Sequence, residues 1–110
     1  MNKLETILRD LAPYLDNGRG VDEISVTVGG VLWSDGCNWY EFNPLKNPSD
    51  FVILLEHYEV EIEYRATAAY VTCSIWNKTT LESVEGEDLR QTVVDIVYKF
   101  INNLTCVTLF

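Results

Sequence analysis

The sequence predicts an α+β fold in which helices pack on an antiparallel sheet. Two observations lead to this class. Segments with helically spaced apolar residues flank groups of short segments in which apolar and polar residues alternate, and the links between all of these segments are short. Short links suit antiparallel strands, whereas parallel strands need a long crossover. The predicted order is α-β-β-β-α-β-β-β-α, with a further strand at the C-terminal end.

The first predicted helix begins next to Asn2. Asn2 and Glu5 have the spacing of a capping box, and Pro13 limits the length of the helix. A loop follows over residues 16–20, which are rich in Asp, Asn and Gly. The apolar stripe of this helix consists of Leu4, Ile7, Leu8 and Leu11.

Three short strands are predicted next. Apolar and polar residues alternate over 24–28, as in a half-buried strand. Gly29-Gly30 predicts a two-residue hairpin turn, after which residues 31–33 start the return strand. A second turn at 34–36 leads into the third strand, residues 37–42.

The segment from Asn43 to Tyr58 predicts a sharp turn and a capped helix. Asn43-Pro44 and Asn47-Pro48 are turn dipeptides that interrupt regular structure. Asn47 is the predicted N-cap, Pro48 suits the first helical position, and Asp50 places negative charge near the positive end of the helix dipole. The apolar face consists of Phe51, Leu54, Leu55 and Tyr58.

The next strand shows strict alternation over residues 59–64. This pattern predicts one apolar face and one row of carboxylates. The apolar face holds Val60, Ile62 and Tyr64, and the carboxylate row holds Glu59, Glu61 and Glu63. Two more strands are predicted at 70–76 and 81–85, with a turn between them at 77–80.

The last predicted helix begins near Glu87-Asp88, whose charges suit a helix N-terminus. Asn102-Asn103 is expected to end it. The remaining segment, Leu104 to Phe110, is apolar and rich in Thr and Val, and it predicts a seventh strand. The buried stripe of the helix consists of Leu89, Val93, Ile96, Val97 and Phe100.

Length and charge narrow the class of protein. A chain of 110 residues is expected to form a single domain over 1–110. Its 17 acidic and 8 basic residues give a net charge of −9, which disfavours nucleic acid and anionic membranes as direct partners. The same charge favours a cationic partner or serves solubility alone. The N-terminus lacks a leader pattern, so we expect a cytoplasmic protein.

Side chains with chemical potential are few. Cys37, Cys73 and Cys106 lack C-x-x-C spacing, so reduced thiols are expected. His57 stands beside Glu56 and near Glu59, which favours either an acid-base pair, a weak metal site or simply a residue at a helix C-terminus. Cys37 follows an Asp-Gly turn and is either a nucleophile or inert. The common hydrolase, nucleotide-binding and zincin motifs are absent from the sequence, so we expect no catalytic residue, metal or cofactor, and no enzymatic activity.

Two groups of residues are candidates for partner binding. The first is the carboxylate row, in which same-face neighbours in a strand are roughly 6 to 7 Å apart, close to the spacing of phosphates along a nucleic-acid strand. The row is extended by Glu82, Glu85, Glu87 and Asp88. The second group is aromatic and consists of Trp33, Trp39 and Tyr40, with Trp76 as a further member. The alternatives are a solvated sheet face for the carboxylates and core filling for the rings.

One part of the chain resembles a known family. Trp39, Phe42-Asn43-Pro44, the Asn47-Pro48 helix start and the Glu82-Ser83-Val84-Glu85-Gly86 strand that precedes the last helix resemble the phage ABA sandwich family. The resemblance covers about residues 39–102. It implies a phage setting and an accessory role, and it brings no catalytic residue to carry over.

These observations together predict a non-enzymatic phage-type binding protein. We expect it to inhibit a host antiviral defence complex by masking a basic, nucleic-acid-binding surface, as an anti-CRISPR candidate would. One alternative is an oligomeric sponge that sequesters a signalling nucleotide, for which cationic side chains would have to converge. Those available are Arg19, Arg65, Lys78 and Arg90. Another is a virion or assembly component, or a homodimer, joined through the predicted C-terminal strand.

Overall fold

The computed structural model describes residues 2–15, 20–65, 70–77 and 80–107, with only the backbone described at positions 65, 70, 77, 80 and 104–107. Within these residues the order of the main elements is α-β-β-β-α-β-β-β-α, which confirms the predicted class and order. The strands form two separate three-stranded antiparallel sheets instead of one. The chain divides into two compact units, Met1–Asn43 and Pro44–Phe110, which are described in turn. The single domain predicted for 1–110 stays a prediction.

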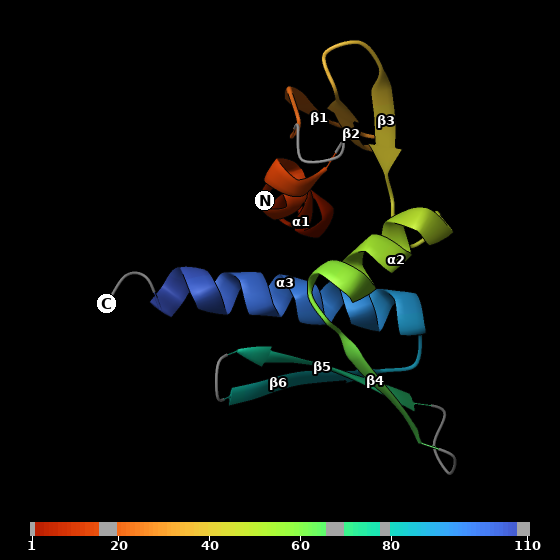
Figure 1. Ribbon diagram of the computed structural model, residues 1–110. Coiled ribbons are helices and arrows are strands. Elements are labelled where there is room, and N and C mark those ends of the chain that lie inside the picture. The colour runs from red at the N-terminus through yellow and green to blue at the C-terminus, as the bar shows by residue number, and fades with distance from the viewer. Residues whose placement is uncertain (1, 16–19, 66–69, 78–79, 108–110) are drawn as a thin grey trace. The chain divides into compact units, whose positions relative to one another are not determined.

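The first unit begins with helix α1, Lys3–Leu11, and a short 3-10 turn η1, Ala12–Tyr14. The Oδ1 atom of Asn2 accepts a hydrogen bond from the backbone N–H of Leu4 at 2.8 Å, so Asn2 is the N-cap as predicted. Pro13 lies in η1, where α1 has already ended. The buried residues of α1 are Ile7, Leu8 and Leu11. Figure 1 shows α1 on one side of the first sheet.

The first sheet contains β1, Glu23–Thr27, β2, Gly30–Ser34, and β3, Trp39–Phe42. Thr27 pairs with Gly30, so the two turn residues of the hairpin are Val28 and Gly29. The predicted Gly29-Gly30 turn was therefore wrong by one residue. Gly30 has φ +145°, a conformation that glycine tolerates best, and it begins β2 as a paired residue.

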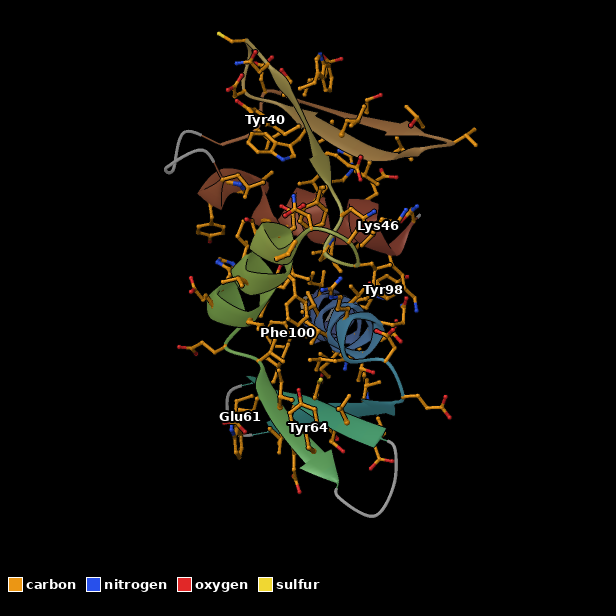
Figure 2. The ribbon with its side chains drawn as sticks, turned by 90° about the vertical axis from the view of Figure 1, so that its right-hand side faces the viewer. Tyr40, Lys46, Glu61, Tyr64, Tyr98 and Phe100 are labelled. Carbon is orange, nitrogen blue, oxygen red and sulfur yellow. The ribbon has the colours of Figure 1, made fainter. Side chains whose placement is uncertain are left out.

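The second unit contains β4, Glu61–Arg65, β5, Tyr70–Asn77, and β6, Thr80–Gly86, which form the second sheet in that order. Helix α3, Leu89–Val107, packs on β5 and β6, and helix α2, Pro48–His57, packs on α3. Figure 1 shows α3 between the sheet and α2. The rings of Tyr58 and Phe100 meet edge-to-face with centroids 6.1 Å apart, and Phe100 projects from α3 in Figure 2.

The start of α2 confirms the predicted cap, and its end departs from the prediction. Asn47 Oδ1 accepts the backbone N–H of Ser49 at 3.0 Å. At the other end, the N–H of Val60 donates to the carbonyl of Leu55 at 3.1 Å, and Glu59 has φ +52°. These are the features of a Schellman motif with Glu59 at the left-handed position. The predicted strand over 59–64 is thus wrong at its start, because Glu59 belongs to the turn and β4 begins at Glu61.

Strand pairing decides which side chains of the second sheet face α3. Ile62 pairs with Cys73, which pairs with Val84, so all three side chains lie on one face. Cys73 and Ile75 of the central strand are almost fully buried, at 0% and 2% exposure. The face that carries them is therefore the face covered by α3, and the other face of the sheet is turned toward solvent.

Helix α3 is longer than predicted. It continues through Asn102 and Asn103 to Val107, so the seventh strand predicted over 104–110 was wrong for 104–107, and residues 108–110 lie outside the described residues. The side chain of Asn103 donates from Nδ2 to Glu82 Oε1 at 2.6 Å. Asn103 is thereby tied to the sheet, and it does not terminate the helix. The buried residues of α3 are Thr92, Val93, Val94, Ile96, Val97 and Ile101.

At the junction between β6 and α3, we expect substitutions of Gly86 and Thr92 to have non-additive effects on the free energy of unfolding. A Cβ atom at Gly86 would lie in hard contact with Thr92 Oγ1, which donates to the carbonyl of Asp88 at 2.6 Å. Gly86→Ala should lower the free energy of unfolding by about 1–3 kcal/mol. In a Thr92→Ala background the same change should be less costly, because the clashing oxygen is gone. Urea unfolding of the four proteins measures the coupling, and strictly additive losses would contradict the predicted contact.

Candidate functional site

The solvent face of the β4–β6 sheet carries three of the predicted carboxylates. Glu61 and Glu63 lie two residues apart on β4, and the register Glu63–Thr72–Glu85 crosses the three strands. The backbones of Glu63 and Glu85 are therefore two strand spacings apart, about 10 Å. All three glutamates are exposed. The side chains of Glu61, which is labelled in Figure 2, and Glu63 make no hydrogen bond or ion pair within the described part of the chain.

The same pairing removes Glu82 from this group. Glu82 is opposite Ile75, and its side chain is on the face covered by α3. Its Oε1 atom accepts a hydrogen bond from Asn103, while its Oε2 atom is buried and has no hydrogen-bond partner among the described residues. The prediction that Glu82 extends the exposed carboxylates was wrong, because residues of alternate parity in one strand face opposite sides of the sheet.

Glu59, Glu87 and Asp88 also lie apart from the regular row. Glu59 is exposed, but its left-handed backbone ends the extended spacing before Glu61. The Oδ1 atom of Asp88 accepts the N–H of Gln91 at 3.0 Å, so Asp88 caps α3. Glu87 and Asp88 border a separate open hollow of about 600 Å³ at the starts of α2 and α3. Of the predicted carboxylates, Glu61, Glu63 and Glu85 therefore share the solvent face of the sheet.

Trp76 and Leu81 add apolar surface to the solvent face. They pair with each other across β5 and β6, and their side chains are 54% and 45% exposed. Exposed tryptophan beside charged groups is typical of a binding surface. Leu81 was not among the predicted binding residues. Thr72, Ser74 and Trp76 alternate with apolar residues, so the sequence alone could have placed the Trp76 ring on the polar face of its strand. The residue that lies opposite Trp76 could not be predicted, because it depends on the register of the two strands.

A hollow opens beside Trp76 at the edge of this face. Its volume is about 410 Å³, and its lining residues are Tyr58, Glu59, Val60, Glu61 and Trp76. Tyr58 is 7% exposed, whereas Glu59 and Glu61 are exposed. The hollow thus combines aromatic surface with two carboxylates. Sequence reasoning missed it, because the turn at Glu59 bends the chain there.

The aromatic residues of the first unit do not form one patch. The rings of Trp33 and Tyr40 are 4.6 Å apart at an angle of 32°, and these residues pair across β2 and β3. Trp39 precedes Tyr40 in β3 and therefore projects from the opposite face of the sheet. Trp39 and Tyr40 are 49% and 41% exposed, so core filling does not explain them.

A hydrogen-bonded turn supports Tyr40. Asp35 Oδ1 accepts the backbone N–H groups of Asn38 at 2.7 Å and Cys37 at 2.8 Å, and Asp35 Oδ2 accepts the hydroxyl of Tyr40 at 3.1 Å. The hydrogen bond from Asn38 and then that from Cys37 lower the pKa of Asp35 most. Burial opposes them, and the hydrogen bond from Tyr40 lowers the pKa by less than burial raises it. The carboxylate thus organises the turn in its charged form.

The other reactive side chains that the structure describes are His57, Cys37 and Cys73. His57 lies in the last turn of α2 and meets Tyr58 edge-to-face at 4.8 Å, which agrees with its interpretation as a helix-end residue. Cys37 is exposed at the turn, and burial raises the pKa of the Cys73 thiol. Cys106 has no described side chain. Within the described residues, no three His, Cys, Asp or Glu side chains are grouped so that they could hold a metal ion.

The cations proposed for a nucleotide site are mostly outside the described residues. Arg19 and Lys78 are not described, and of Arg65 only the backbone is described. Arg90 donates from Nη1 to the carbonyl of Leu45 at 2.9 Å and lines the α2–α3 hollow beside two carboxylates. The edge strand proposed for self-association loses its basis over 104–107, because those residues are helical.

No family model matches this sequence, and neither a curated protein nor a solved structure matches it. The resemblance of residues 39–102 to the phage ABA sandwich family stays a prediction. None of the helices described is both long enough and apolar enough to cross a membrane.

We expect the contribution of the Asp35 turn to stability to decrease in acid. Folding lowers the pKa of the Asp35 carboxyl. The charged carboxylate therefore stabilises the fold at any pH above the pKa that Asp35 has in the unfolded chain, and this stabilisation is lost as the pH falls through the lower pKa of the folded state. Asp35→Asn should therefore be less stable than the wild type at neutral pH, and the difference should shrink in acid. Thermal unfolding at several pH values measures this, with Asp22→Asn as the control. A difference that does not change with pH would contradict the prediction.

Proposed function

We propose that this protein binds a basic surface of another protein through the solvent face of its β4–β6 sheet and catalyses no reaction. The observation that supports this most strongly is the register that places Glu61, Glu63 and Glu85 on one exposed face together with Trp76. Carboxylates steer a cationic partner and select it, and an exposed tryptophan supplies the apolar contact that makes a complex persist.

The electrostatics of the chain agree with this partner class. A net charge of −9 attracts cationic surfaces from a distance and repels nucleic acid and anionic lipid. Glu61 and Glu63 have no cationic partner within the described residues, so a partner would not have to displace an internal ion pair there. A lysine or arginine of the partner can therefore pair with these two carboxylates without breaking an existing contact.

The narrower proposal concerns the setting. The resemblance of residues 39–102 to phage accessory proteins favours a host protein as the partner, in the cytoplasm of an infected cell. The partner class that best fits a carboxylate surface is a defence protein whose nucleic-acid-binding channel is basic, because that channel presents closely spaced cations. Occupation of such a channel would inhibit the defence complex by excluding its nucleic acid.

Reversal of three charges tests the binding face. The triple variant Glu61→Lys, Glu63→Lys, Glu85→Lys should bind a short peptide of alternating lysine and serine at least about 10-fold more weakly, since each exposed ion pair contributes roughly 0.2–1 kcal/mol and each new lysine repels the peptide. Titration followed by backbone amide shifts in NMR gives the affinity and locates the contact. Raised salt should weaken wild-type binding, because exposed charges are screened over about 10 Å at 0.1 M.

A second triple variant serves as the matched control. Asp22→Lys, Glu23→Lys, Glu56→Lys changes the net charge equally at exposed positions that do not belong to the β4–β6 sheet. It should retain the affinity to within about 3-fold. Equal losses in the two variants would mean that only net charge matters, and the proposal of a specific face would then be wrong.

The host-directed proposal has its own readout. Wild-type protein expressed in bacteria that carry an RNA-guided defence nuclease should raise the plating efficiency of a phage which that nuclease targets. The sheet-face variant should lose this effect, and the control variant should keep it. If wild-type protein leaves plating unchanged across several defence nucleases while peptide binding is intact, the defence setting is wrong and the binding face stands.

A further inference from the structure

We propose that the hollow formed by Tyr58, Glu59, Val60, Glu61 and Trp76 binds the guanidinium group of an arginine side chain on the partner. This inference rests on the proposed function, because it assigns an anchor point within the binding face. The hollow has a volume of about 410 Å³, which is enough for one long side chain and lies within the usual range of small binding pockets.

The backbone arrangement brings the aromatic and acidic groups together. Glu61 pairs with Ser74 of β5, and Trp76 follows two residues later on the same face. Antiparallel pairing therefore carries the turn residue Glu59 toward Trp76 as the chain leaves α2. The indole is 54% exposed, although the neighbouring Ile75 is buried to 2% exposure. The exposed ring of Trp76 lines the hollow together with Glu59 and Glu61.

The chemistry of the lining selects a planar cation. An anion would meet two carboxylates that have no cationic partner within the described residues. An apolar side chain would remove those carboxylates from water without pairing them. A guanidinium stacks on an indole, donates two parallel hydrogen bonds to a carboxylate and is weakly hydrated, whereas a lysine ammonium is a compact and strongly hydrated charge.

The backbone conformation of Glu59 makes it possible to distinguish a role in arginine binding from a role in the stability of the turn. Glu59 occupies the left-handed position of a Schellman motif, where glycine is the most favourable residue. Stability of the turn alone would therefore favour glycine at this position. Glu59→Gly should relieve the strained conformation and raise the Tm by about 2–5 °C, while it removes one carboxylate from the lining of the hollow.

The test uses the full chain and single amino-acid derivatives. N-acetyl-arginine methylamide should shift the Trp76 indole N–H and the amides of residues 59–61 in NMR titrations. The citrulline derivative, which has nearly the same shape but no charge, should bind at least about 10-fold more weakly, and the lysine derivative about 3-fold more weakly. Equal affinity for arginine and citrulline, or for arginine and lysine, would overturn the assignment.

Variants locate the site. Glu59→Gly should weaken arginine binding by about 3- to 10-fold although the protein is more stable, and Trp76→Leu should weaken it by a similar factor. The matched control is Glu23→Gln with Glu41→Gln, two exposed residues of the first sheet that belong neither to the β4–β6 face nor to the hollow and should leave binding of the arginine derivative unchanged. An effect of the control as large as that of Glu59→Gly would overturn the proposal.

Comparison with the lysine and serine peptide distinguishes the two proposals. If the sheet-face charge reversal weakens peptide binding while Trp76→Leu and Glu59→Gly leave arginine binding unchanged, the arginine site is wrong and the proposed function stands. If the hollow behaves as described but the charge reversal leaves peptide binding unchanged, the hollow binds arginine and the broader binding face is wrong.

Discussion

The packing of α3 on one face of the β4–β6 sheet is the constraint on which the candidate site depends. The helix buries Val93, Ile96 and Val97, and the central strand contributes Cys73 and Ile75 to the interior. Once these strand residues face the helix, their neighbours along the strand must point to the opposite face of the sheet, because side chains alternate. Burial of apolar surface, at roughly 25 cal/mol per Å², stabilises the arrangement in which Cys73 and Ile75 face the helix. The acidic surface is thus a consequence of where the apolar residues go.

The same alternation explains why the acidic residues of the second unit have different roles. Glu61, Glu63 and Glu85 have the parity of the solvent face, whereas Glu82 has the parity of Ile75. Asp88 lies beyond the sheet and caps α3. Proximity in sequence therefore does not make these carboxylates one surface. The residues that can meet a partner together are those that the register aligns across strands.

Local chemistry made much of the fold predictable, and long-range pairing made the site hard to predict. Asn47 and Pro48 specify a helix start through their own backbone and side chain, so the prediction held. Glu59 was misjudged because strict alternation also fits a turn followed by a strand, and the left-handed conformation at φ +52° has no signature in a glutamate. Trp76 and Leu81 meet only through the register of β5 and β6, which no local pattern determines.

The contact between Glu82 and Asn103 shows why local signals at the end of α3 were overridden. An Asn-Asn pair and a following Thr- and Val-rich segment favour a helix stop and a strand. Asn103 instead donates to Glu82 Oε1 at 2.6 Å, across 21 positions of sequence. This hydrogen bond satisfies one buried oxygen of the Glu82 carboxylate, so it favours helical backbone at Asn103 over a stop at the Asn-Asn pair. The glutamate that is absent from the exposed surface thereby joins the last turns of α3 to β6.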